Sequence, residues 1–154
     1  MTADHFPYAG VVDLAGHATV RQHQAWSGAD GPVFELVGRP SPGGVTWAWA
    51  RMDLDTATVA TAKRELSPLL TGAGPPGVVL VHLGQECFVD LRGLRLLLGT
   101  AARVRSRGGA LAVVAPPRCL RLMVRLGRVD AELPLVTTAR QAAWWARTRE
   151  RGTP

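Results

Sequence analysis

The sequence predicts an α/β fold, a small sheet of mixed strands with parallel central strands and about four helices. Two apolar runs, VVLVHL at 78–83 and ALAVVA at 110–115, are typical of strands that are covered on both faces. Segments with helical periodicity follow each run, and strands that alternate with helices favour parallel pairing. The expected order of elements is β-β-α-β-α-β-α-β-α.

The first elements are expected to be a hairpin and a helix. Residues 33–37 form a short apolar run, and residues 45–54 begin with apolar side chains at every second position, which indicates two strands joined by a Pro- and Gly-rich turn. Asp55 and Thr56 can cap a helix whose apolar residues recur at helical spacing. Pro68 is expected to weaken its last turn, because proline lacks a backbone N–H.

The later elements follow the same alternation. Asp90 can cap a second helix, which the glycines at 108–109 end. A third helix is expected to open at 116–117 and a short strand to cover 133–136. Thr138 can cap the last helix.

The length of 154 residues favours one main domain. Residues 1–31 have no sustained periodicity and are expected to be a partly ordered appendage. The main domain is expected over 32–147, with a polar tail at 148–154.

Composition excludes several classes of protein. Apolar residues make up 47% of the chain, which is ordinary for a globular protein, yet no run approaches the roughly 18 apolar residues of a membrane span. The first residues carry neither a basic nor an apolar stretch of the kind found in a signal peptide, so we expect a cytoplasmic protein without a membrane partner.

The net charge of +6 is unevenly distributed. Nine arginines and only two acids lie between residues 84 and 128, so this part of the chain could bind an acidic partner. A GC-rich coding sequence would also enrich the chain in arginine. The arginines are not interleaved with the aromatic residues that stack on single-stranded nucleic acid, which argues against a nucleic-acid partner.

Motifs for catalysis, metal binding or a cofactor are absent from the sequence. Cys87 has no histidine base in its own segment, and His82 falls within an expected core strand. Cys87 and Cys119 fit neither a disulfide framework nor zinc spacing. Three histidines near the start of the chain, His5, His17 and His23, are not spaced like the ligands of a known metal site. We therefore expect a non-enzymatic protein that binds neither a metal ion nor a cofactor.

Three acids, Asp53, Asp55 and Asp90, lie close to the expected ends of strands, where α/β folds place their sites. Such carboxylates could act together as a general acid and base. The simpler interpretation is that Asp55 and Asp90 each cap a helix.

Three blocks of the sequence together resemble a STAS domain of the anti-sigma-factor antagonist family. Residues 52–70 read MDLDTATVATAKRELSPLL, and residues 78–117 read VVLVHLGQECFVDLRGLRLLLGTAARVRSRGGALAVVAPP. Residues 120–145 read LRLMVRLGRVDAELPLVTTARQAAWW. Their order and spacing match the family's strand ending in Leu-Asp, its central strand and motif helix, and its closing turn and helix.

The resemblance implies a switch that this chain has altered. Family members accept a phosphoryl group on a hydroxyl just after the motif aspartate. The motif here reads Asp90-Leu91-Arg92-Gly93-Leu94, so Leu91 and Arg92 replace both hydroxyl positions, while Asp90 and Gly93 match. Asp53 matches a second family acid. Arg92 places a permanent cation where phosphorylation would place a dianion, either as a working contact or through drift.

The resemblance also implies a function in transcription regulation. The expected activity is non-enzymatic binding of an anti-sigma factor of the kinase-like ATPase type, without phosphorylation at the usual motif. The expected contacts come from the loop at 84–90 and from Asp53, Asp55, Thr56, Asp90, Leu91, Arg92, Gly93 and Arg95. The alternatives are a STAS scaffold or accessory subunit, in a stressosome-like or lipid-transport complex, and a small-ligand or nucleotide sensor.

Overall fold

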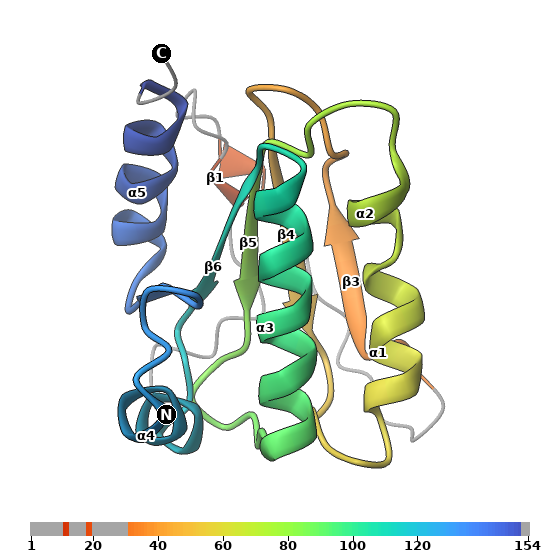
Figure 1. The fold of residues 1–154 in the computed structure, drawn as a ribbon, viewed down its shortest axis with the longest axis vertical. Coiled ribbons are helices and arrows are strands. Elements are labelled where there is room, and N and C mark those ends of the chain that lie inside the picture. Colours follow the sequence, from red (N-terminus) through yellow and green to blue (C-terminus); the bar gives the residue numbers. More distant parts are fainter. Residues whose placement is uncertain (1–10, 13–17, 20–30, 152–154) are drawn as a thin grey trace. The chain divides into compact units, whose positions relative to one another are not determined.

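The computed structural model describes residues 11–12, 18–19 and 31–151. The chain divides into two compact units, residues 1–31 and 32–154. In the first unit, β1 (Val11–Val12) and β2 (Ala18–Thr19) pair antiparallel. The second unit contains the remaining elements (Figure 1).

The second unit is built on a five-stranded sheet with the order β3-β4-β5-β6-β7. The strands are β3 (Phe34–Val37), β4 (Val45–Ala50), β5 (Val78–His82), β6 (Ala110–Val114) and β7 (Leu135–Val136). β3 pairs antiparallel with β4, and every other pair is parallel. This topology confirms the predicted hairpin and the predicted adjacent, parallel and central positions of β5 and β6.

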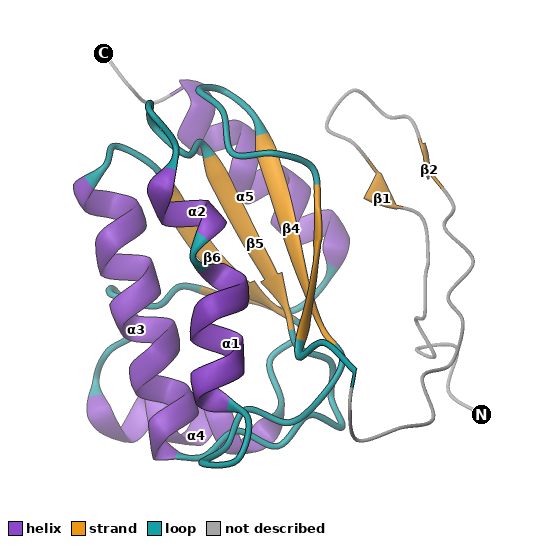
Figure 2. Cartoon of the chain, turned by 90° about the vertical axis from the view of Figure 1, so that its right-hand side faces the viewer, coloured by secondary structure: helices purple, strands orange, loops and turns teal. Residues whose placement is uncertain are grey.

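The helices are α1 (Val59–Leu66), α2 (Pro68–Thr71), α3 (Leu91–Ser106), α4 (Arg118–Gly127) and α5 (Ala139–Arg151). Figure 2 shows α1 and α3 on one face of the sheet and α5 on the other. Alternate residues of β5 therefore face different layers. Val79 and Val81 join the main core with Leu97 of α3, whereas Leu80 belongs to the opposite face, and all four are almost completely buried.

Several boundaries differ from the sequence-based prediction. The strand predicted over 45–54 ends at Ala50, because the later residues bond to turns and loops: the Asp53 carbonyl accepts a hydrogen bond from Thr58 Oγ1 at 2.5 Å, and the Leu54 N–H donates to the Phe88 carbonyl. The helix predicted up to Leu70 is interrupted at Ser67, and Pro68 opens α2. The final helix continues to Arg151, so the polar residues from 148 begin inside α5.

Candidate functional site

The candidate site lies where two loops follow the carboxyl ends of β4 and β5 and meet at the start of α3. Leu54 and Val89 form an isolated parallel bridge between these loops, and both side chains are buried. The Leu54 N–H donates to the Phe88 carbonyl at 2.8 Å, and the Asp90 N–H donates to the Leu54 carbonyl at 3.1 Å. The bridge fixes both loops relative to the first turn of α3.

Asp90 connects the two loops through its carboxylate. Oδ1 accepts a hydrogen bond from the Gly93 N–H at 2.9 Å and so caps α3, as predicted. Oδ2 accepts from the N–H and the hydroxyl of Thr56, at 3.1 and 3.3 Å. The Gly93 hydrogen bond, followed by those from Thr56, lowers the pKa of Asp90 below its usual value. The carboxylate is therefore ionised at neutral pH, at the end of the helix that favours a negative charge.

The other two acids bind different backbone groups. Asp53 Oδ1 accepts from the Phe88 N–H at 2.9 Å, which holds the second loop against the first. Asp55 Oδ1 accepts from the N–H groups of Ala57 and Thr58, at 2.9 and 3.2 Å. Asp90 thus caps a helix as predicted, whereas Asp55 binds the turn that precedes α1, whose own N-cap, Thr58, makes no side-chain capping bond.

Gly93 lies at a close approach between α3 and the two loops. A Cβ atom at this position would meet the Leu54 carbonyl oxygen, Leu54 Cβ and Val89 Cγ1 at distances that real Cβ atoms do not show. The close approach requires a residue without a side chain. The motif glycine thus has a structural role, and it is buried.

Around this scaffold, several of the predicted contact residues are exposed. Leu91 is 54% exposed in the first turn of α3, and Arg92 and Arg95 are exposed on the same helix. Sequence reasoning placed Phe88 only within a contact loop, but the structure leaves its side chain 51% exposed. The adjacent Val89 is equally apolar but buried, so apolar character alone did not mark Phe88 as exposed.

The thiol and imidazole groups near the site are poorly suited to nucleophilic chemistry. Burial, and then the charge of Asp53, raises the pKa of the Cys87 thiol to about 12, which leaves little thiolate at neutral pH. Burial lowers the pKa of His82 to about 4, and its ring lies 4.4 Å from that of Trp49. The Cys119 thiol points to the Cys87 carbonyl, with Sγ 3.9 Å from the oxygen.

The described part of the chain contains no group of three His, Cys, Asp or Glu residues placed to hold a metal ion. His5, His17 and His23 lie outside the described residues. None of the described helices is long and apolar enough to cross a membrane.

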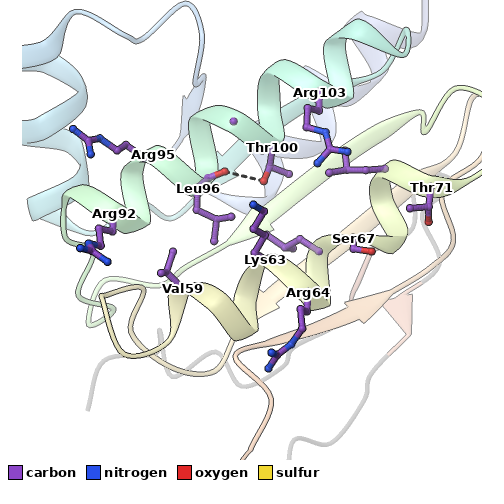
Figure 3. Close-up of a pocket in the computed structure, with 13 residues that line it drawn as sticks. Val59, Lys63, Arg64, Ser67, Thr71, Arg92, Arg95, Leu96, Thr100 and Arg103 are labelled. Carbon is purple, nitrogen blue, oxygen red and sulfur yellow. Dashed lines mark hydrogen bonds between the residues drawn. The ribbon is translucent and has the colours of Figure 1, made fainter.

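A groove lies beside the site, between α1 and α2 on one side and α3 on the other. Its volume is about 750 Å³, and Arg92 and Arg95 are among the residues that line it. Figure 3 shows Lys63 pointing from α1 toward α3, whereas Arg64 points away from α3. Two of the predicted contact residues thus belong both to the first turns of α3 and to this groove.

Comparison with solved structures identifies the fold. The chain is similar to an anti-sigma-factor antagonist (STAS) domain protein from Planctomyces limnophilus, with a TM-score of 0.63 and 17% identity over 74% of this chain and 97% of that one. It is also similar to an anti-sigma factor antagonist from Mycobacterium paratuberculosis, with a TM-score of 0.61 and 21% identity over 79% and 99% of the two chains. The chain therefore has the STAS fold, as the sequence predicted.

A third solved structure places the same fold in a different setting. The murine anion transporter Slc26a9 matches with a TM-score of 0.58 and 14% identity, over 68% of this chain and 18% of the transporter. No family model matches the sequence. No curated protein matches it either.

Proposed function

We propose that this protein is a non-enzymatic regulator that acts in the cytoplasm by binding an anti-sigma factor. We call its contact region the α3 entry surface. It comprises the loop at 84–90 together with Asp53, Asp55, Thr56, Asp90, Leu91, Arg92 and Arg95, and the buried Gly93 supports it from beneath. The STAS fold supports this proposal, because two solved proteins of the same fold are described as anti-sigma factor antagonists.

The observation that carries the proposal is the exposure of two large apolar side chains on a fixed scaffold. Phe88 and Leu91 are each about half exposed, on either side of the hydrogen-bonded Asp90. Large apolar side chains that a fixed scaffold holds in solvent can act as the anchors of a protein interface, where a few central residues supply most of the binding free energy. The hydrogen bonds of Asp53 and Asp90 keep both loops in one conformation before binding, which reduces the entropy lost on association.

The chemistry of the first turn of α3 favours binding that phosphorylation does not control. The resemblance places the phosphoacceptor at Leu91 or Arg92, and neither side chain has a hydroxyl group. In this proposal the partner is of the kinase-like ATPase type, and the protein holds it whether or not that partner has ATP. Arg92 adds a cation at the rim of the surface, where it can meet an acidic group of the partner.

Affinity capture with the immobilised full chain tests the contact surface. We expect the wild-type protein to retain an anti-sigma factor that mass spectrometry identifies, and Phe88→Ala and Leu91→Ala each to weaken its binding by about tenfold or more. Leu126→Ala is the matched control, because Leu126 is 75% exposed but lies on α4. Equal binding by all three variants would show that the partner does not use this surface.

Incubation with the captured kinase and ATP tests the absence of a switch. We expect no added phosphate on residues 90–94 and an unchanged affinity. The double variant Leu91→Ser, Arg92→Ser restores two hydroxyl groups, and its phosphorylation should weaken binding by placing charge beside Asp90. A phosphate on another residue, such as Ser106, that abolishes binding would contradict the proposal.

Arg92→Ala tests whether Arg92 contacts the partner or is a substitution without a role in binding. A contact with an acidic group of the partner should make this variant bind less tightly by about 1 kcal/mol, with an association rate that depends on salt. An unchanged affinity would assign the arginine to drift and leave the apolar anchors as the basis of binding.

The second candidate function is that of an accessory domain in a larger complex. The likeness to part of an anion transporter supports it, because there the same fold is one portion of a much longer chain. Capture of a membrane transporter or of a large assembly, in place of an anti-sigma factor, would favour this candidate.

A further inference from the structure

The groove between α1, α2 and α3 combines an apolar floor with a cationic rim. Leu66, Leu70 and Leu96 contribute the apolar part, and Leu66 is almost fully buried. Five of the thirteen lining residues are cationic, and none is acidic. An open groove of this composition is unusual for a surface that meets only water, because apolar area stays hydrated and like charges face one another.

The charges on the rim lack acidic partners within the described residues. The lining cations are Lys63, Arg64, Arg92, Arg95 and Arg103, of which Arg64 points away from α3, and none of them forms an ion pair with a described residue. Lys63 and Arg103 stand on opposite walls of the groove (Figure 3). An occupant with acidic groups along both edges would relieve this repulsion and match the potential of the groove.

Gly99 supplies an independent observation. It occupies the middle of the sixteen-residue helix α3, where glycine costs about 1 kcal/mol relative to alanine. Gly93 on the same helix is explained by its close approach to Leu54, but a Cβ at Gly99 would meet nothing within 4 Å. No contact within the described domain requires glycine here. The missing side chain leaves a notch in the wall of the groove, where the backbone of an occupant can approach α3 closely.

The shape of the groove favours a helical occupant. α1 and α3 run side by side and form its walls (Figure 2). Arg92 and Arg103 are eleven positions apart on α3, which corresponds to a length of about 16 Å along the helix axis. Three turns of an α-helix have the same length, and helices bind such grooves through apolar residues at positions i, i+3 or i+4, and i+7.

We infer that the groove binds an acidic amphipathic helix of a protein partner. This helix runs along α3 and comes closest to it at Gly99. The apolar stripe of this helix packs on Leu70 and Leu96, and its glutamates or aspartates pair with Lys63 and Arg103. The groove is a second contact surface, which shares Arg92 and Arg95 with the α3 entry surface. Gly99 and Arg103 line the groove and lie outside the α3 entry surface, so variants at these two positions let the two proposals fail separately.

Fluorescence anisotropy with a designed peptide tests the inference. The probe is a labelled peptide of about four helical turns, with leucines on one face and glutamates on both flanks. The control peptide has the same composition, shuffled so that the leucines share no face. We expect the full-length protein to bind the amphipathic peptide at least about tenfold more tightly than the shuffled one.

Three variants locate the binding. Gly99→Leu fills the notch and should weaken binding of the peptide by about tenfold, while the thermal unfolding midpoint stays the same or rises. Arg103→Ala should weaken binding through the loss of one charge. Arg121→Ala is its matched control, because Arg121 is an exposed arginine of α4 and does not line the groove. Its affinity for the peptide should equal that of the wild type.

Several results would overturn the inference. Equal binding of the two peptides, or no binding of either, would show that the groove does not recognise a helical apolar face. Wild-type affinity in Gly99→Leu would place the peptide elsewhere, and equal losses in Arg103→Ala and Arg121→Ala would indicate attraction by net charge alone. Binding to phosphatidylglycerol vesicles that Gly99→Leu abolishes, without binding of the peptide, would assign the groove to a lipid surface instead.

Discussion

The two sides of helix α3 differ in whether contacts within the domain explain their residues. On the side that faces the sheet and the two loops, Gly93, Leu94 and Leu97 are buried, and each is explained by a contact within the domain. On the side that faces the groove, Arg95 and Gly99 are exposed, and nothing in the described domain accounts for the glycine. The contrast indicates that residues of the first side serve folding, whereas the second side is the one that we propose to bind a partner helix.

Two leucines test the buried side with the largest expected effect. Leu97→Ala should lower the free energy of unfolding by roughly 2–5 kcal/mol, because it leaves a cavity in the main core. Leu80→Ala, on the opposite face of the sheet, should lower the free energy of unfolding by roughly 2–5 kcal/mol as well. It shows what a cavity costs at a core position outside α3. Urea unfolding measures both, and a loss below about 1 kcal/mol would mean that the site is not well packed.

The fold was predictable because its main signals are local. Strands β5 and β6 are covered on both faces, so their sequences are almost continuously apolar, and this property directly indicates a central position. The cap at Asp90 was predictable for the same reason, since a capping aspartate and its helix are neighbours in the sequence.

The site was less predictable because it joins segments far apart in the sequence. The bridge between Leu54 and Val89 and the hydrogen bond from Thr56 to Asp90 depend on how two loops meet. The exposure of Phe88 follows from the same packing, since its apolar character alone would equally suit a core residue. The groove depends on the spacing of α1 and α3, which periodicity along one helix does not report.

Gly93→Ala tests the close approach at the start of α3. The added methyl group would meet the Leu54 backbone, so the helix or the loop must shift, and the free energy of unfolding should fall by about 1–3 kcal/mol. Thermal and urea unfolding measure this loss. An unchanged stability would show that the close approach relaxes easily and that Gly93 and Gly99 are not different in kind.

Asp90→Ala tests the cap that fixes the same turn. Removal of the carboxylate leaves the Gly93 N–H without its acceptor and should lower the free energy of unfolding at pH 7. Because folding lowers the pKa of Asp90, this contribution is present above the unfolded pKa and is lost as the pH falls through the lower, folded value. The wild type and the variant should therefore converge in stability under acid, and a constant difference at all pH values would contradict the capping role.

Gly99→Ala has the smallest expected effect, and its sign is the opposite of that for Gly93→Ala. The new methyl group meets open space, and alanine loses less conformational entropy than glycine when a helix forms. The free energy of unfolding should therefore rise by about 0.5–1 kcal/mol, which careful urea titrations of the two variants in parallel can resolve. A fall in stability would mean that the domain itself needs the glycine, through a contact or a strained backbone, and the distinction between the two sides of α3 would be lost. A rise shows that folding alone favours alanine at this position, so that the domain does not require the glycine, as the proposed groove contact expects.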